Sequence, residues 1–358
     1  MENNLENNSE NNFIHRKQEN QENSVLFFGA WDIAQSYKCV DESLSKRGFS
    51  VVHIPKDRFI HEHGIDNLNK TVEKLCDIHE PKFSLIWKQD NRMLSTLDVF
   101  TRKNIPVMVY SWDDPHHIDI NPDAIEFSKR CQWTGSCCSG SVEYLLNEGV
   151  VNVHWVLPGF SPRYHYYEYS PDYLCDISFV ATNIYDPREY PHVMASRATM
   201  VRLATKYTNS IKIYGRGEGH MGWLDKTWSD PEIKDLYRGW IDYNDAHLVF
   251  SNTLINLNSH VRPDGYKYLN ERVFQILGCK GFMLCDKVSG IEEIFDIGIA
   301  GEIEVYTSIN DFEDKVAFYL KNRDYASKIA ERGYKKVMDN YTWDHFVDRL
   351  LKHYEGLK

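Results

Sequence analysis

Residues Lys267–Phe295 read KYLNERVFQILGCKGFMLCDKVSGIEEIF and contain the alternation that decides the fold class. Apolar residues recur at helical spacing over Leu269–Leu277, and Gly278 ends this predicted helix. The short apolar run Gly281–Cys285 predicts a buried strand, and Ile291–Phe295 predicts the start of another helix. Helix, strand, loop and helix in this order form the unit of an open parallel sheet.

The loop Asp286–Gly290 lies between this predicted strand and the helix that follows it. In open parallel sheets, ligands bind beyond the carboxyl ends of the strands, against helix N-termini. Ser289 and Gly290 are therefore candidates for holding a phosphate. An ordinary α/β unit without a ligand explains the same pattern equally well.

Strands and helices alternate along the rest of the chain in the same way, which predicts an α/β protein with two doubly wound parallel-sheet domains. The Asn- and Glu-rich segment at residues 1–23 has almost no apolar residues and is expected to be disordered. The predicted domains are residues 24–157 and 173–340, joined by a proline- and tyrosine-rich connector at 158–172. A helix at residues 341–358 ends the chain.

The predicted strands are Ser24–Gly29, Phe49–Ile54, Phe83–Trp87, Pro106–Tyr110, Cys131–Thr134, Val153–Leu157, Asp176–Val180, Ile211–Tyr214, Leu254–Leu257, Gly281–Cys285 and Glu302–Tyr306. The predicted helices, besides the two in the opening stretch, lie within Ala30–Arg47 and at Leu68–Ile78, Leu94–Arg102, Val142–Asn147, Met194–Lys206, Tyr243–Phe250, Asn310–Lys321, Tyr325–Asp339 and Trp343–Tyr354.

Composition narrows the function classes. The chain has 358 residues, of which 42% are hydrophobic and 26% charged, and its net charge is −11. No apolar run approaches the ~20 residues of a membrane span, and the polar N-terminus does not resemble a signal peptide. Several of the eight cysteines fall in apolar runs, as expected of reduced, buried thiols in a cytoplasmic protein. The acidic balance argues against binding nucleic acid by phosphate neutralisation, although a local basic groove stays possible.

The segment Ser111–His117, SWDDPHH, follows a predicted strand and gathers carboxylates and imidazoles where catalytic groups commonly lie. A base that deprotonates a hydroxyl must be a carboxylate or a neutral histidine within hydrogen-bond reach. We therefore predict that Asp113, Asp114 or His116 acts in catalysis or positions an acceptor. The alternatives are a turn shaped by an aspartate before proline, and a metal site, for which the helical ligand spacing is missing.

Four further residues are predicted to contact the ligand. Gly29 follows the first strand, where a glycine lets the backbone approach a ligand, although a tight turn explains it as well. Thr182 offers a donor at the end of another strand, and Arg188 adds charge nearby, unless the pair is only a helix cap and an exposed arginine. Arg216 lies in the glycine-rich segment IYGRGEGHMG, which lacks the following apolar helix of a dinucleotide fingerprint and is predicted to be a flexible loop.

The segment Asn256–Arg272 concentrates positive charge in this acidic protein. Arg262, Lys267 and Arg272 lie just upstream of the predicted phosphate loop, with Tyr266 and Asn270 between them. This arrangement suits a diphosphate partner. A solvated face of a loop and helix is the alternative.

Several stretches resemble the C-terminal domain of CgeB-like (spore maturation protein type) glycosyltransferases, within the group 1 glycosyltransferases of GT-B fold. They are NERVFQ, GCKGFMLCD, IEEIF, EVYTSINDFEDKVAFYL and NYTWDHFVDRLL. The similarity extends upstream through LVFSNTLINLN, IKIYG, DISFVAT and VLPGFSP to WDDPHH, and covers most of Val25–Tyr354.

The resemblance implies two Rossmann-like domains facing a cleft, with C-terminal helices packing back toward the first domain. It implies a glycosyltransferase that needs no metal and no other cofactor, with a nucleoside-diphosphate sugar in the C-terminal domain and an acceptor at the N-terminal one. By matched position, Arg272 and Gln275 lie at the donor nucleotide and Ser289–Gly290 near its phosphates.

One position departs from the family. The family usually has a glutamate where this chain has Gln275, and an amide accepts hydrogen bonds without charge. A non-catalytic nucleotide-sugar-binding protein and a nucleotide-sugar epimerase therefore remain alternatives. The acceptor is left open among a glycan, a protein, a small molecule and a modified nucleic acid base.

Overall fold

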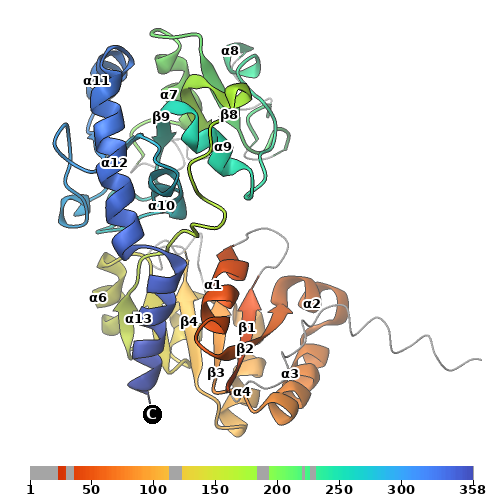
Figure 1. Ribbon diagram of the computed structural model, residues 1–358. Coiled ribbons are helices and arrows are strands. Elements are labelled where there is room, and N and C mark those ends of the chain that lie inside the picture. The colour runs from red at the N-terminus through yellow and green to blue at the C-terminus, as the bar shows by residue number, and fades with distance from the viewer. Residues whose placement is uncertain are drawn as a thin grey trace, which may run out of the picture. The chain divides into compact units, whose positions relative to one another are not determined.

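The computed structural model describes residues 23–29, 36–112, 123–183, 193–219, 222–225 and 231–357 (Figure 1). It divides into two compact units, which are considered separately below. Unit 1 comprises the described residues of Met1–Leu157 together with those of Trp343–Lys358, and unit 2 comprises those of Pro158–Thr342.

Unit 1 is a six-stranded, all-parallel sheet in the order β2-β1-β3-β4-β5-β6. The strands β1 to β4 are largely apolar runs, as expected where helices cover both faces of a parallel sheet. Their bounds are β1 Asn23–Gly29, β2 Phe49–Pro55, β3 Phe83–Trp87, β4 Val107–Ser111, β5 Trp133–Ser136 and β6 Val153–Trp155. The helices are α1 Ser36–Ser45, α2 Lys56–His63, α3 Ile65–His79, α4 Leu94–Arg102, α5 Ala124–Ser128, α6 Gly140–Asn147 and α13 Trp343–Glu355, with a short 3₁₀ helix at Asn91–Met93.

The C-terminal helix α13 belongs to unit 1, although almost 300 residues separate it from α1. Figure 1 shows the two helices alongside one another. The Ser43 hydroxyl donates to the Asp344 carboxylate at 2.6 Å, and Arg47 Nε donates to Asp348 Oδ1 at 2.6 Å. Trp343 at the start of α13 is almost fully buried. The prediction that the chain returns to the first domain at its C-terminus is therefore confirmed.

Unit 2 is a five-stranded, all-parallel sheet in the order β11-β10-β9-β7-β8. The strands are β7 Cys175–Val180, β8 Ile211–Tyr214, β9 Thr253–Asn258, β10 Met283–Asp286 and β11 Glu304–Tyr306. The helices are α7 Arg197–Ala204, α8 Pro231–Lys234, α9 Ala246–Ser251, α10 Glu271–Gly278, α11 Ile309–Lys321 and α12 Arg323–Asn340, with 3₁₀ helices at Pro171–Tyr173 and Ile291–Glu293.

The core of unit 2 joins the sheet to α7, α11 and α12. Phe179, Ile255 and Leu284 of three neighbouring strands pack with Val316 of α11 and Ile329 of α12, and all five are almost fully buried. At about 25 cal/mol per Å² of buried apolar area, burial of such side chains is the main favourable term in folding. It fixes the carboxyl ends of the strands, where the candidate site lies.

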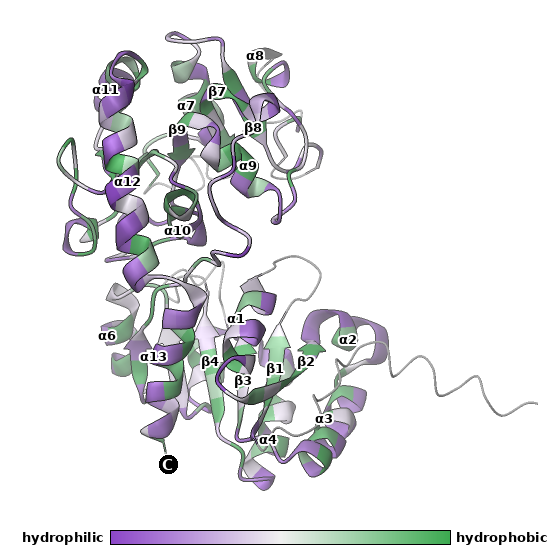
Figure 2. Ribbon diagram, in the orientation of Figure 1, coloured by the Kyte–Doolittle hydropathy of each residue, from purple (hydrophilic) through white to green (hydrophobic). Residues whose placement is uncertain are grey.

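One local prediction is wrong, and one eight-residue helix was missed. The sequence Ile291–Phe295 does not start an α-helix, because the structure has only a three-residue 3₁₀ helix, Ile291–Glu293. Helix α2 was not predicted, because Lys56 is its only buried residue and it has no apolar stripe. Figure 2 shows α2 as largely hydrophilic.

Candidate functional site

The strand order of unit 2 places a topological switch point between β7 and β9. From β7 the chain moves outward to β8, and it then returns to the other side of β7 to form β9, β10 and β11 in turn. In open α/β sheets, ligands bind outside the carboxyl ends of the strands at such a point. The residues that follow β7, β9 and β10 are therefore the first place to look for a site.

A buried arginine crosses the switch point. Arg197 is 4% exposed and lies at the start of α7. Its Nε donates to Ser259 Oγ at 2.9 Å, beyond β9, and its Nη1 donates to the Thr182 carbonyl at 2.7 Å, beyond β7. Sequence reasoning did not single out Arg197. Its spacing could have indicated burial, because Arg197 lies three and four residues before Met200 and Val201, on the buried face of the same helix.

A second polar contact joins the ends of β9 and β10. The backbone N–H of His260 donates to Asp286 Oδ2 at 2.9 Å, and its Nδ1 lies 2.7 Å from Asp286 Oδ1. The His260 side chain is fully buried, and the Asp286 side chain is 8% exposed. Within the described part of the chain, His260 Nε2 has no hydrogen-bond partner. The backbone contact fixes Asp286 at the edge of the sheet.

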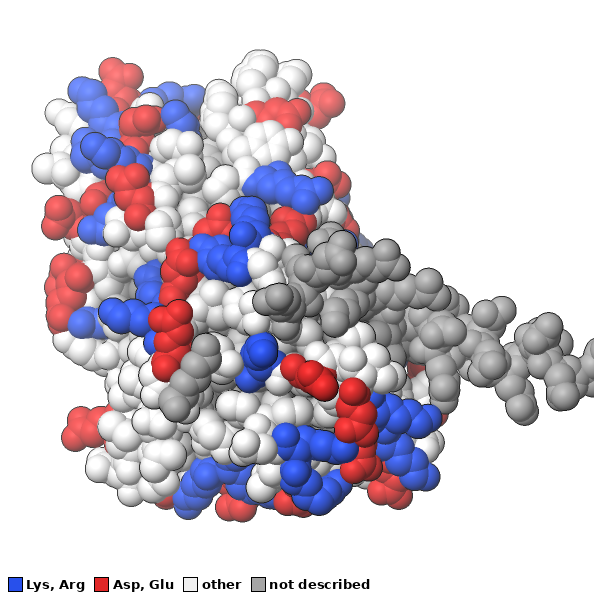
Figure 3. All heavy atoms as spheres, turned by 60° about the horizontal axis from the view of Figure 1, so that its bottom comes forward, with Lys and Arg blue, Asp and Glu red and all other residues white. Residues whose placement is uncertain are grey.

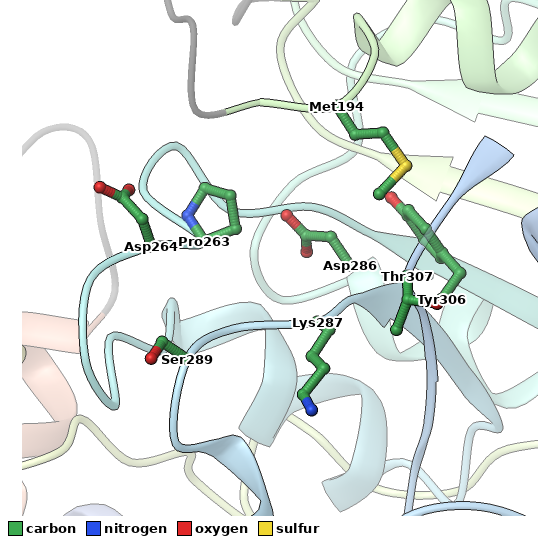
Figure 4. A pocket seen from close by; sticks show the side chains of 8 residues that line it. All are labelled: Met194, Pro263, Asp264, Asp286, Lys287, Ser289, Tyr306 and Thr307. Carbon is green, nitrogen blue, oxygen red and sulfur yellow. The ribbon is translucent and has the colours of Figure 1, made fainter.

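A cavity of about 350 Å³ opens at this edge. It is lined by Met194, Pro263, Asp264, Asp286, Lys287, Ser289, Tyr306 and Thr307. In Figure 4 the tip of Tyr306 and the Met194 side chain point toward one another, the Asp286 carboxylate lies between them and Pro263, and the Lys287 ammonium points away. The volume lies within the range of small-molecule sites, and the lining combines apolar surface with a few polar groups.

Two of the predicted ligand-binding segments meet beside this cavity. The N–H of Lys267 donates to the Ser289 carbonyl at 2.7 Å, and the N–H of Ser289 donates to the Pro263 carbonyl at 2.8 Å. Gly290 has φ +76°, and a Cβ on it would come within 2.5 Å of the Tyr266 ring. A side chain at this position would meet both the left-handed backbone and the ring, so the glycine permits the two loops to pack closely.

The structure changes the physical reason for expecting an anion at Ser289 and Gly290. They were expected to precede an α-helix whose N-terminal amides hold phosphate, whereas only a single 3₁₀ turn follows. A helix dipole therefore does not favour an anion here. What the structure places beside the loop instead is a pair of cations.

Both cations contact carboxylates. Arg262 donates to Asp264 through Nε at 2.9 Å and through Nη2 at 3.0 Å. Lys267 Nζ lies 2.6 Å from Glu293 Oε2, and the Tyr266 hydroxyl donates to the other oxygen of the same carboxylate. The ammonium and the phenol together hold the pKa of Glu293 below its usual value. The Lys267 ammonium group is therefore paired with Glu293, while the backbone of Lys267 contacts Ser289.

An amide network lies at the carboxyl end of β9. Asn258 Nδ2 donates to Asn270 Oδ1 at 3.1 Å, and Asn270 Nδ2 donates to the Ser259 carbonyl at 3.0 Å. Arg272 Nη1 donates to Asn258 Oδ1 at 3.3 Å. The predicted residues Asn270 and Arg272 are thus held against the same strand end as Arg197.

Gln275 lies one helical turn beyond Glu271 on α10 and is 9% exposed. The Tyr243 hydroxyl donates to Glu271 Oε1 at 2.8 Å. Burial raises the pKa of Glu271 to about 7, against the lowering effect of hydrogen bonds from Tyr243 and Gln275. A carboxyl group is therefore present on this helix, one turn before the position where the resemblance leads one to expect it.

The remaining predicted residues lie elsewhere. Gly29 is in unit 1, and the Tyr37 ring fills the space where its Cβ would stand, 2.6 Å away. Arg216 is exposed in the glycine-rich segment beyond β8. In that segment a Cβ on Gly215 would come within 1.9 Å of the Ala181 carbonyl oxygen, so this glycine serves close packing. Asp113, Asp114, His116 and Arg188 lie outside the described residues.

Charge, metal and membrane features complete the description. Among the described residues on the face shown in Figure 3, basic and acidic side chains are interspersed and do not form the continuous basic surface that nucleic acid phosphates favour. In the described ranges no group of three or more His, Cys, Asp or Glu is placed to hold a metal ion. No helix in the same ranges is long and apolar enough to cross a membrane.

Sequence comparison relates the chain to known proteins in two ways. Residues 193–352 match the model of a family described as glycosyl transferase-like. The chain is also 22% identical over 283 residues to spore protein CgeB of Bacillus subtilis (strain 168), an alignment that covers 76% of this chain and 82% of CgeB. The predicted resemblance to CgeB-like proteins is confirmed.

Solved structures match over nearly the whole chain. Sucrose-phosphate synthase from Thermosynechococcus elongatus has a TM-score of 0.68 at 9% identity, covering 94% of this chain and 99% of that one. Anabaena HepE in complex with UDP-glucose has a TM-score of 0.64 at 10% identity, covering 93% and 99%. The predicted fold is confirmed: the chain has two Rossmann-like domains of the GT-B type, and residues 193–352 carry the similarity to the glycosyl transferase-like family.

Proposed function

We propose that this chain is a glycosyltransferase of the EC 2.4 class, which transfers a sugar from a nucleoside-diphosphate sugar to a hydroxyl acceptor. One observation carries the proposal. Ser289 and Pro263 line the cavity on the carboxyl edge of the second sheet, inside the region similar to glycosyl transferase-like proteins. The backbone N–H of Lys267 donates to the Ser289 carbonyl, and Arg262 directly precedes Pro263 in the chain. The UDP-glucose bound to HepE, which has the same fold, supports a nucleotide-sugar donor.

The main requirement of sugar transfer at this edge of the sheet is positive charge near the leaving diphosphate. As the bond between the anomeric carbon and the diphosphate oxygen breaks, negative charge grows on the leaving diphosphate. Preorganised cations near that oxygen stabilise the transition state more than the ground state. We assign this role to Lys267 and Arg262, and Arg272 would contact the nucleotide from the start of α10. No metal is required in this scheme.

The acceptor hydroxyl must lose its proton as its oxygen bonds to the anomeric carbon. A carboxylate or neutral histidine takes that proton. We assign this step to Asp113, Asp114 or His116 of unit 1, and donor binding to unit 2. The eight buried, free cysteines suit a protein that works in the cytoplasm.

The proposal is tested by incubating the full chain with UDP-, GDP- and ADP-sugars, with and without a mixture of sugar, peptide and oligonucleotide acceptors. We expect release of the nucleoside diphosphate to depend on an acceptor, with the sugar recovered on that acceptor. Conversion of the donor sugar to an isomer without an acceptor would identify an epimerase instead. Binding of a nucleotide sugar without any turnover would identify a non-catalytic binding protein.

A further inference from the structure

The contact between Lys267 and Glu293 lies beside the Ser289–Gly290 loop, where we propose that a donor phosphate binds. Glu293 accepts from the Lys267 ammonium at 2.6 Å with one oxygen and from the Tyr266 hydroxyl with the other. The Lys267 ammonium also lies 5.1 Å from the centre of the Tyr266 ring. A carboxylate therefore fills the anion position in front of the cation.

We propose that Glu293 is a displaceable counter-ion: it occupies the anion subsite of Lys267 and is exchanged for a phosphate group of the donor, so that it sets donor affinity. The inference rests on the proposed function, because it assumes that the anion arriving at Lys267 is a diphosphate.

The two partners differ in how firmly they are held. Lys267 is anchored by its backbone N–H on the Ser289 carbonyl, its φ is +56°, and its side chain is 16% exposed. The Glu293 side chain is 49% exposed and leaves the 3₁₀ turn toward solvent. The backbone of Lys267 therefore keeps its position when Glu293 rotates away, and the released carboxylate is readily hydrated.

The buried pair of His260 and Asp286 shows the opposite case. Asp286 is 8% exposed and accepts from both the backbone and the ring of His260, so its release would leave buried groups unpaired. Of these two carboxylates at the edge of the sheet, Glu293 is the one that an incoming anion can replace at low cost.

The proposal predicts a small increase in anion affinity when the charge of Glu293 is removed. Exposed ion pairs contribute little, so removing the charge of Glu293 should tighten anion binding by about two- to five-fold. The gain should disappear at high salt, because screening weakens interactions between exposed charges. If Glu293 instead positioned Lys267 for the phosphate, the same change would weaken binding.

The experiment is calorimetric titration of the full chain with inorganic pyrophosphate and with UDP, at low and at high ionic strength. The variants are Glu293→Gln, Lys267→Met, the double variant and, as a matched control, Glu331→Gln, whose carboxylate lies 3.2 Å from Lys280. We expect tighter binding by Glu293→Gln alone, no change in Glu331→Gln, and no gain from Glu293→Gln when Lys267 is replaced by methionine.

Two outcomes would overturn the inference, and they are distinguishable. If the wild type binds and Glu293→Gln binds equally or more weakly, Glu293 is not a competitor, although the proposed function stands. If neither the wild type nor any variant binds pyrophosphate or UDP, both the proposed donor site and this inference are wrong.

Discussion

Among the described residues, the carboxyl edge of the first sheet carries a cluster of aromatic rings beside the buried ion pair of Lys56 and Asp90, whereas that of the second carries charged and amide side chains. In unit 1 the Trp87 ring lies 4.8 Å from Tyr110 and 5.5 Å from Trp112, and Trp112 stacks on Trp343 at 6.1 Å and 15°. In unit 2 the corresponding edge carries the buried side chains of Arg197, Asn258, His260 and Asp286.

The two sheets nevertheless share one strand order, with a sixth strand added in unit 1. The difference therefore does not come from topology but from the residues that follow each strand, which is where function resides on shared folds. The polar edge suits a charged ligand such as a diphosphate. The cluster of Trp87, Tyr110, Trp112 and Trp343 serves packing, and it holds α13 through Trp343.

The largest expected effect tests the aromatic cluster. Trp343 is 1% exposed and stacks on Trp112, so Trp343→Ala removes a large buried side chain. We expect the free energy of unfolding to fall by about 3–5 kcal/mol, as for other large-to-small changes in cores. Urea unfolding followed by far-UV circular dichroism measures this loss.

Trp240→Ala is the matched control, because that ring is 67% exposed. A surface substitution of this kind should change the free energy of unfolding by less than about 0.5 kcal/mol. Equal losses in the two variants would show that the aromatic cluster does not hold α13.

A smaller effect tests the carboxyl group at the start of α10. Burial raises the pKa of Glu271 from 4.5 to about 7, so the folded protein binds a proton between these values that the unfolded chain has released. Its contribution to stability is present below pH 4.5 and is lost as the pH rises through 7. We expect Glu271→Gln, whose amide still accepts from Tyr243, to be more stable than the wild type by about 1–3 kcal/mol at pH 8.

Thermal unfolding at pH 8 and pH 4.5 measures this difference, with Glu331→Gln as the exposed control. At pH 4.5 the advantage of Glu271→Gln should have largely vanished, since the wild-type carboxyl is then protonated. A stability difference that is the same at both pH values would mean that Glu271 does not titrate as its burial suggests.

Much of the fold was predictable from local sequence. The strand at Phe83–Trp87 and the helix at Leu94–Arg102 have the predicted bounds, because both carry strong apolar patterns. Helix α2 escaped prediction because its residues are mostly exposed, and the turn after Gly290 looked helical because IEEIF is too short to show a period. Local sequence therefore predicts an element well where burial of one face gives its apolar residues a regular spacing.

The site was predictable only in part. The charge on Arg262 and Lys267 and the turn at Ser289 could be recognised locally, and the fold brought them together. The contacts of Arg197 with Ser259 and of His260 with Asp286 join residues 62 and 26 positions apart, so they depend on the strand order. No local pattern could have paired them.

The central claim is that the polar edge of the second sheet binds a nucleoside diphosphate. Calorimetric titration of the wild type, Arg272→Ala and the exposed control Arg202→Ala with UDP and GDP tests it most directly. Loss of a charged contact to phosphate or ribose should weaken binding by about ten-fold or more, with the melting temperature unchanged. We predict this loss in Arg272→Ala and wild-type affinity in Arg202→Ala; wild-type affinity in Arg272→Ala, or no binding by the wild type, would contradict the account.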